Sequence, residues 1–479
     1  MSSKLAFLDV FFSSLSYHIF LPRRLSYHKI KHFKSPLRLF SQKFSYTLTI
    51  NMKNTFLKSA VILLIGGLIT KILAMIIKIC LTRSIGDEGI SLYMLILPTF
   101  NLFITLSTLS LTTGTSKIIS EGKKRSKNII LTMLPLTLFY NLILMLVVII
   151  LAHPISTILL KNESTYYPLM AISLTLPFIC LSNLLRGYFF GKENMLPQVL
   201  SNILEQIVRL ILTIYFIPNL LKYSLTIAIT GVVLINIISE LSSVILLIIF
   251  MPKTNISLND FKPNKKIIKD VLDISLPTTS SRLIGSLAYF FEPIIITYTL
   301  LNVGYSSQYI TLEYGVVNGY VYPLLLLPSF FSTAVSNALL PVISNAYSKG
   351  NIKRAKQKNK EAVLICLLIG IPISILFMAF PTCFLKAIFN TNLGANYIIL
   401  ASPLFIFHYI QSPLTITLGA INKAKVAMRG TLYGCIIKLI LLALLCYLKL
   451  GMWSLIIASS INIIFVTFHH LYYTHKYLK

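Results

Sequence analysis

The sequence predicts an all-α integral membrane protein with about twelve transmembrane helices, in two six-helix lobes (a parallel repeat) around a central cavity. Hydrophobic residues make up 56% of the 479 residues, and charged residues make up only 12%. Apolar stretches recur from Phe56 to the C-terminus. Each is about 20 residues long, which is enough to cross a bilayer as a helix.

The predicted spans follow one another without an inserted soluble domain. Their approximate cores are 56–80, 90–112, 129–152, 166–189, 196–217, 224–250, 270–300, 315–341, 362–384, 394–418, 427–448 and 453–474. Connections after even-numbered spans are rich in Lys and Arg, including Arg186 after the fourth, whereas the others hold few. Because basic loops stay in the cytoplasm, we expect a multi-pass protein of the cytoplasmic membrane with both termini cytoplasmic.

A weak internal repeat predicts how the spans are grouped. The second span ends in SLTTGTSKIISEGKK (110–124) and the eighth in TAVSNALLPVISNA (333–346), and both lead into strongly basic connections. Two halves in the same orientation are the parallel-repeat architecture of a transporter, with the binding site between the halves. We expect an N-terminal lobe at 52–252, a cytoplasmic connection at 253–269 and a C-terminal lobe at 270–479.

Residues 1–51 differ from the rest, with eight Lys and Arg residues against the single acid Asp9. Three interpretations fit this basic extension: a surface-bound helix, a targeting segment, or upstream translation that is not part of the native protein. We favour the last, because Met52 opens directly onto the first span and no small-residue cleavage site is evident.

Lys71 and Lys78 lie inside the first span. Their seven-residue spacing is nearly two helical turns, so both lie on one face about 10 Å apart. Each ammonium at membrane depth costs about 2.5–3.5 kcal/mol, which favours a position facing a protein interior or an aqueous cavity. The alternative is that Lys78 extends to the membrane interface. We predict one wall of a cationic cavity, which suits an anionic cargo.

Arg282 is the third predicted substrate-binding cation, near the middle of the seventh span. It follows Pro277 and a run of hydroxyl residues, which can compensate the carbonyl that the proline leaves free. The guanidinium suits phosphate because its planar fork donates two parallel hydrogen bonds. We therefore predict that Lys71, Lys78 and Arg282 bind the substrate.

Five further ionisable residues within spans are candidates for a cavity or for ion coupling. Glu205 and Arg209 are four residues apart, which also fits an intrahelical ion pair. Lys438 has no acid nearby in the sequence and is a weaker cavity candidate. Glu240 and Glu292 fit either coupling to H⁺ or Na⁺ or pairing with a lysine.

No motif predicts an enzyme, a cofactor or a metal site. There is no Walker A, GxSxG or HExxH sequence, and the six cysteines are scattered without a zinc spacing. The net charge of +29 is spread over short connections, which argues against a nucleic-acid partner. Without a nucleotide-binding motif, an ion gradient, the membrane potential or the cargo's own gradient must drive transport.

Four stretches resemble the polysaccharide-transport branch of the MOP flippase superfamily, which includes the stage V sporulation protein B type and is related to lipid II flippases. They are GGLITKILA (66–74) with LTRSIGDEGISLY (81–93), LRGYFFG (185–191) with ILEQIVR (203–209), ISLPTTSSRL (274–283), and GYVYPLLLLPSFF (319–331) with ALLPVIS (338–344). The resemblance runs from about Met52 to the C-terminus. Sporulation-type members typically carry fourteen spans, two more than are predicted here.

The resemblance implies a flippase that moves lipid-linked saccharides by alternating access, for polysaccharide, cell-wall or spore biogenesis. A monomer is sufficient for this cycle, so we expect a monomer. The implied partners are membrane lipids and a saccharide on an undecaprenyl-pyrophosphate-type carrier. Lys71, Lys78 and Arg282 occupy positions of the kind that face the cavity in flippase relatives. Two alternatives stay open: a cation-coupled multidrug antiporter of the same superfamily, which needs cavity acids, and a non-transporting membrane scaffold for envelope or spore assembly.

Overall fold

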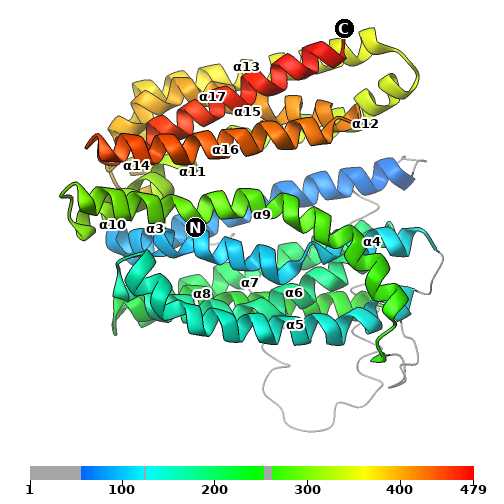
Figure 1. Cartoon of the computed structure of the whole chain (residues 1–479), viewed down its shortest axis with the longest axis horizontal. Helices are drawn as coiled ribbons and strands as arrows, with labels where there is room; N and C mark the ends of the chain where they lie inside the picture. Colours follow the sequence, from blue (N-terminus) through cyan, green and yellow to red (C-terminus); the bar gives the residue numbers. More distant parts are fainter. Residues whose placement is uncertain (1–54, 123–125, 253–260) are drawn as a thin grey trace, which may run out of the picture. The chain divides into compact units, whose positions relative to one another are not determined.

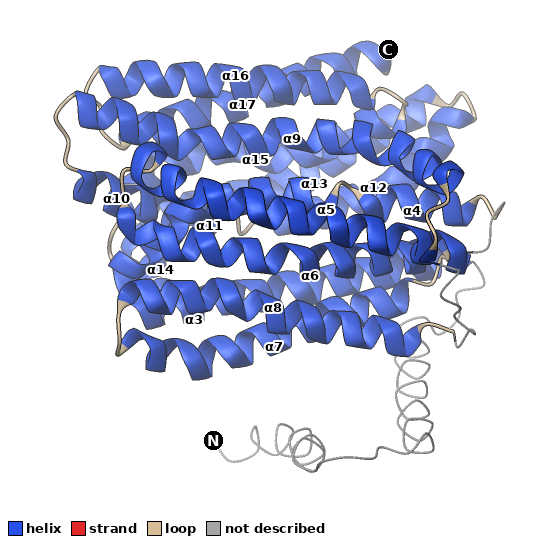
Figure 2. Ribbon diagram, turned by 60° about the horizontal axis from the view of Figure 1, so that its bottom comes forward, coloured by secondary structure: helices blue, strands red, loops and turns tan. Residues whose placement is uncertain are grey.

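Helices account for all the regular structure in the residues that the computed structural model describes, which are 55–122, 126–252 and 261–479. Figures 1 and 2 show these helices running roughly parallel or antiparallel to one another. The predicted extension at 1–51 and part of the predicted connection, 253–260, lie outside the described residues.

The first half of the described chain, residues 55–252, contains six α-helices. These are α3 (Thr55–Thr108), α4 (Leu111–Ser120), α5 (Ser126–Pro154), α6 (Tyr166–Gly191), α7 (Met195–Leu221) and α8 (Leu225–Phe250), with a π-helix η1 (Ile155–Leu159) and a 3₁₀-helix η2 (Glu163–Thr165) between α5 and α6. The long helix α9 (Lys265–Asn302) follows.

The second half, residues 303–479, holds the remaining helices. These are α10 (Ser307–Val316), the π-helix η4 (Val317–Val321), α11 (Tyr322–Leu325), α12 (Ser329–Ser348), α13 (Ile352–Ala379), α14 (Pro381–Phe389), α15 (Ala395–Ala420), α16 (Ala424–Tyr447) and α17 (Trp453–Tyr477). Figure 1 shows α13, α15, α16 and α17 on one side of α9, and α5 to α8 on the other. Helix α9 packs against both α4 and α16. The lobe boundaries stay a prediction.

The helices supply the predicted number of membrane crossings. Ten helical segments of the described residues are long and apolar enough to span a bilayer, and the bent pair α10–α12 makes eleven. The segment Ile62–Ser120 runs for 59 residues and breaks at Gly86, whose φ of 69° and ψ of −172° end one helix and begin another. Two crossings need only about 40 residues. With α3 crossing twice, the fold agrees with the twelve predicted spans.

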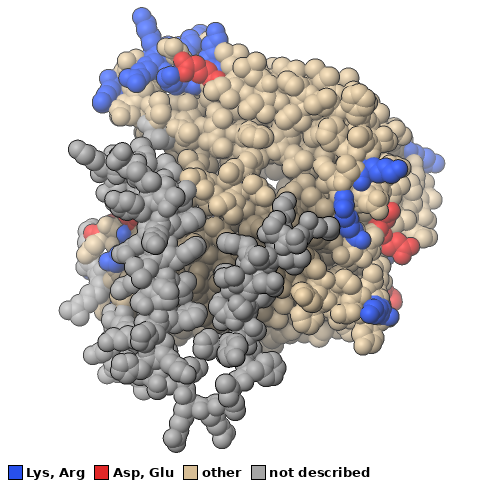
Figure 3. Space-filling view, turned by 180° about the vertical axis from the view of Figure 1, so that it is seen from behind, with Lys and Arg blue, Asp and Glu red and all other residues tan. Residues whose placement is uncertain are grey.

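The outer surface of the helices is apolar, as a lipid environment requires. Ile150 and Leu368 are each 73% exposed, and many other large apolar side chains point outward. Figure 3 shows a wide uncharged surface between groups of charged side chains. Because exposed apolar patches of this extent are rare in water-soluble proteins, these helices are membrane spans.

The buried core is shared at one end of the bundle and divided at the other. Near Gly86, one cluster joins apolar residues of both halves, including Ile90 and Tyr320. Toward the opposite end, one separate cluster forms around Met133 in the first half and another around Ile343 in the second. We call these the Gly86 end and the basic end. The halves are therefore packed together at the Gly86 end and hold separate cores at the basic end.

Two details of the predicted connections are wrong. Arg186 is counted above with the basic connection after the fourth span, although the predicted core of that span, 166–189, includes it; it lies inside α6, which continues to Gly191. The basic run from Lys353 to Lys360 is also helical, because α13 begins at Ile352. Polar helical turns extend beyond the apolar stretch, so hydropathy makes the predicted helices too short.

Candidate functional site

A cavity of about 190 Å³ lies among α3, α7 and α8, and two cations line it. Lys78 comes from α3 and Arg209 from α7, with the polar side chains of Tyr93, Gln206 and Asn236 beside them. None of the described residues that line this cavity is acidic. Amide and guanidinium N–H groups with an ammonium form a donor-rich, positively charged surface, which favours an anionic ligand.

Lys78 also reaches the second half. Its Nζ donates a hydrogen bond to the carbonyl of Asn318 at 3.1 Å. Asn318 is buried in the π-helix η4, and its own side-chain amide donates to the Tyr314 carbonyl at 3.2 Å. A π-helical turn interrupts the regular α-helical hydrogen-bond ladder and often marks a functional site.

Arg209 is held by a buried network of four charged residues. Its Nη2 donates to Glu205 at 2.6 Å, so this pair does form the intrahelical ion pair that its spacing allowed. Arg186 on α6 donates to Glu205 at 2.7 Å and to Glu240 on α8 at 3.4 Å. The two arginines balance the two carboxylates, and this compensation makes the buried charges tolerable. The network fixes Arg209 at the cavity wall.

Glu292 and Lys438 form a second buried pair, between α9 and α16. The hydroxyl of Tyr314 donates to the same carboxylate at 3.2 Å. Glu292 therefore pairs with a lysine, one of the two roles predicted for it, and the acid that Lys438 lacks in sequence comes from another helix. Neither residue lines the cationic cavity.

The structure does not gather the three predicted cations at one place. Lys71 and Arg282 are exposed, and neither lines the cavity that holds Lys78. Lys71 nevertheless faces the second half, with its Nζ 5.7 Å from the centre of the Phe330 ring on α12. The shared helix face of Lys71 and Lys78 is thus turned toward the other half of the protein.

Hydrogen bonds join the two halves at the Gly86 end, and we call this set of contacts the seal. Arg83 donates to the carbonyls of Ala387 and Ile388 at 2.6 and 3.0 Å, and the Tyr320 hydroxyl donates to Asp87 at 2.5 Å. The other contacts of the seal are Ser91 to the Leu312 carbonyl, Asn162 to Thr311, and Ser307 to the Lys161 carbonyl.

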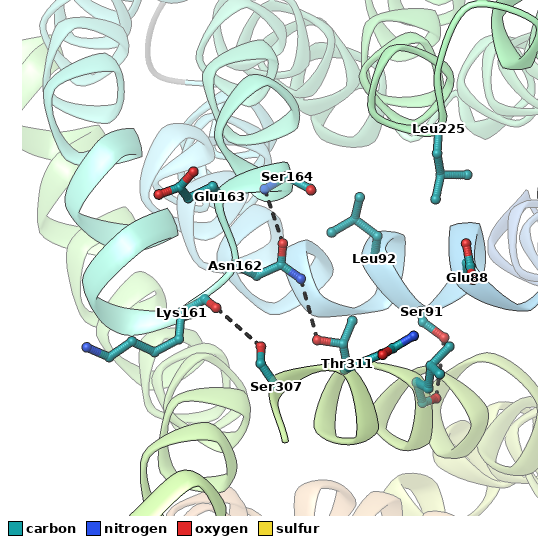
Figure 4. A pocket seen from close by; sticks show the side chains of 12 residues that line it. Glu88, Ser91, Leu92, Lys161, Asn162, Glu163, Ser164, Leu225, Ser307 and Thr311 are labelled. Carbon is teal, nitrogen blue, oxygen red and sulfur yellow. Dashed lines mark hydrogen bonds between the residues drawn. The ribbon is translucent and has the colours of Figure 1, made fainter. Parts of the chain in front are cut away.

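The seal is also closely packed. A Cβ added at Gly315 would lie 2.1 Å from the Ser91 Oγ, so only glycine allows α10 to approach α3 this closely. Beside these contacts lies an open pocket of about 480 Å³ that both halves line. Figure 4 shows Asn162 pointing toward Thr311, and Ser307 toward the Lys161 carbonyl, at its edge.

Comparison with known proteins decides the family. Residues 56–347 match the polysaccharide biosynthesis protein family, and residues 317–444 match the MatE family. Stage V sporulation protein B of Bacillus subtilis (strain 168) is 34% identical over 431 residues, covering 87% of this chain and 83% of that protein. The chain belongs to the polysaccharide biosynthesis protein family.

Other relatives are similar to this family member in sequence, and solved structures of the MOP superfamily share its fold. Lipid II flippase MurJ of Bacillus subtilis (strain 168) is 24% identical over 421 residues, covering 81% of this chain and 77% of that protein. An inward-facing multidrug resistance MATE transporter has a TM-score of 0.71 at 16% identity, over 91% of this chain and 97% of that chain. A MOP superfamily transporter from Pyrococcus furiosus has a TM-score of 0.60 at 17% identity, over 88% and 95%.

Sequence reasoning missed several residues of this polysaccharide biosynthesis family member's site. Arg186 was counted with a connection, although it lies within the apolar stretch at 166–189, and this position indicates a helix. Asn318 contributes through its backbone carbonyl, which no side-chain pattern reveals. Gln206 and Asn236 are uncharged, so a search for intramembrane charges passes over them.

Proposed function

We propose that the chain is a flippase that moves lipid-linked oligosaccharide or a peptidoglycan precursor from the inner to the outer leaflet of the cytoplasmic membrane. The observation that carries the proposal is the cavity with Lys78 and Arg209 on its wall and no carboxylate among the described lining residues. The cargo would then be an undecaprenyl-pyrophosphate-type lipid, whose diphosphate supplies the anionic charge. The kinship with a lipid II flippase and a sporulation protein supports the same substrate class.

The direction of transport follows from the distribution of charge and core. Basic residues gather at the basic end, which supports a cytoplasmic position for that end and for both termini. The separate cores there support an inward-open arrangement, while the seal closes the Gly86 end. Lys71 and Arg282 are exposed between these ends and would guide the diphosphate toward Lys78.

The transport cycle is alternating access. The diphosphate headgroup enters from the cytoplasm and binds Lys78 and Arg209, while the lipid tail stays in the bilayer. The halves then approach at the basic end around the bound headgroup. Opening of the Gly86 end then releases the headgroup on the outer side.

The buried acids favour a cycle driven by the cargo gradient or the membrane potential. Glu205 and Glu240 pair with Arg186, and Glu292 pairs with Lys438. Because each carboxylate already has a cation of the protein as its partner, we assign these acids structural roles rather than an H⁺ or Na⁺ site. The described residues that line the cavity also include no acid that could bind a cationic drug.

Reconstitution into vesicles tests the proposal. The purified chain is expected to move a fluorescent undecaprenyl-pyrophosphate-linked sugar between leaflets and to leave a cationic dye in place. Dye export with no saccharide movement would identify a multidrug antiporter. Absence of both activities, from protein that remains folded, would leave the membrane-scaffold alternative.

A further inference from the structure

Lys78 belongs both to the cationic cavity and to the contacts that join the halves. Its ammonium lines the cavity, and it donates to the Asn318 carbonyl across the boundary between the halves. Arg209, the other cation of the cavity, is instead bonded within its own half to Glu205. Any ligand that draws Lys78 into the cavity therefore acts on a contact between the halves, whereas a ligand of Arg209 does not.

The acceptor of Lys78 lies next to the seal. Asn318 and Tyr320 are two residues apart in the short π-helix η4, and Tyr320 donates to Asp87. Lys78, Arg83, Asp87 and Ser91 follow one another along α3 on either side of Gly86, and each is bonded to the second half. The bond from Lys78 is thus the innermost of a row that continues through the seal.

The chemistry of the acceptor makes this bond easy to exchange. A backbone carbonyl is a neutral acceptor, whereas a phosphate oxygen carries charge, and charge-assisted hydrogen bonds are roughly twice as strong. An anion in the cavity binds Lys78 better once the ammonium has left Asn318, so it stabilises the state in which that contact is broken. Such a difference in affinity between two states is what allows a ligand to shift their populations.

We propose that Lys78 couples occupancy of the cavity to opening of the Gly86 end: binding of a diphosphate draws the ammonium from the Asn318 carbonyl and loosens η4, and with it the Asp87–Tyr320 contact. The coupling rests on the proposed function, because it requires an anionic headgroup in the cavity. Lys78 then positions η4 beside the seal and also binds the substrate.

Spin labels on either side of the seal test the coupling. Glu163→Cys and Gln308→Cys place one label on each half at exposed positions, in a full-length chain whose six native cysteines are replaced. Distances are measured in lipid vesicles with undecaprenyl pyrophosphate, and with undecaprenol as the uncharged control. In the otherwise unchanged protein, undecaprenyl pyrophosphate is expected to raise the separated population, and undecaprenol is not.

Matched variants separate the effect of the hydrogen bond between Lys78 and Asn318 from the effect of the charge on Lys78. Lys78→Met is expected to raise the separated-to-close ratio about fivefold without ligand, the effect of one lost hydrogen bond, and to abolish the ligand response. Lys78→Gln keeps a donor for the carbonyl but loses the charge, so its ligand-free ratio stays low while the response is lost. Arg83→Met weakens the seal outside the cavity and keeps the response. Arg209→Met removes the other cation of the cavity and is expected to weaken the response.

The outcomes are distinguishable. A ligand-free Lys78→Met protein with the wild-type ratio would overturn the coupling, and so would a Lys78→Met protein that still responds as Arg83→Met does. Binding of undecaprenyl pyrophosphate to the wild type without separation of the labels overturns the coupling alone. Failure of the wild type to bind this lipid overturns the proposed function and the coupling together.

Discussion

Glu292 and Lys438 form an ion pair that joins α9 to α16, with the carboxylate only 2% exposed. Removing one partner leaves an uncompensated buried charge, which typically costs about 3–5 kcal/mol. We expect Glu292→Gln and Lys438→Met each to lower the thermal unfolding temperature of the detergent-solubilised protein, and the double variant to recover much of the loss. Equal and additive losses would mean that the pair contributes nothing to the fold.

The exposed pair Lys358–Glu361 on α13 is the control for this experiment. Its side chains are 38% and 42% exposed, so water screens both charges whether or not they are paired. Lys358→Met is expected to leave the unfolding temperature unchanged. A loss as large as that of Lys438→Met would show that the assay does not report burial.

The two acids beside Arg186 should differ in their contribution to stability. Glu205 accepts from two arginines at 2.7 and 2.6 Å, whereas Glu240 accepts from Arg186 at 3.4 Å. Glu205→Gln is therefore expected to destabilise the protein more than Glu240→Gln, by about 1–2 kcal/mol. Thermal unfolding measures the difference, and the opposite order would contradict the network as described.

Close packing at the seal predicts opposite effects for two glycine substitutions. Gly315→Ala places a Cβ against Ser91 and must push α10 away from α3, so we expect lower stability and a looser Gly86 end. Gly285→Ala, in α9, meets nothing within 4 Å and is expected to be neutral or to stabilise by about 0.5–1 kcal/mol. Unfolding temperatures distinguish the two, and equal effects would contradict the packing.

The orientation of the chain can be tested from outside the cell. Glu163 lies at the Gly86 end and Lys356 at the start of α13, and both side chains are exposed. In a cysteine-free background, a membrane-impermeant maleimide is expected to label Glu163→Cys in intact cells and Lys356→Cys only after lysis. The reverse pattern would invert the proposed direction of transport.

Hydropathy and charge predicted the fold because a bilayer leaves few solutions. Long apolar runs must be helices there, and the glycine at position 86 is conformationally free to break α3 between two crossings. The same reasoning failed at Arg186, because a charge near the end of an apolar stretch was counted with the connection although it lies within the helix. Helix ends are set by local hydrogen bonds rather than by hydropathy.

The site was predictable in part. The spacing of Lys71 and Lys78 predicts one shared helix face, and both side chains contact the second half, Lys71 at Phe330 and Lys78 at the Asn318 carbonyl. That this face binds the substrate stays a prediction. That Arg209 and Lys78 line the same cavity was not predictable, because it depends on how α3, α7 and α8 cross in space. Sequence spacing relates residues on one helix, and contacts between helices need the tertiary structure.

The central claim is that a cationic cavity around Lys78 binds the headgroup of the cargo. Measuring transport by the Lys78→Ala variant in vesicles tests this claim most directly. Movement of a fluorescent undecaprenyl-pyrophosphate-linked sugar is compared with that of Lys222→Ala, an exposed lysine just after α7. We expect Lys78→Ala to lose about tenfold or more of the flux, the effect of one charge-assisted contact, and Lys222→Ala to match the wild type. Wild-type flux in folded Lys78→Ala protein would contradict the account.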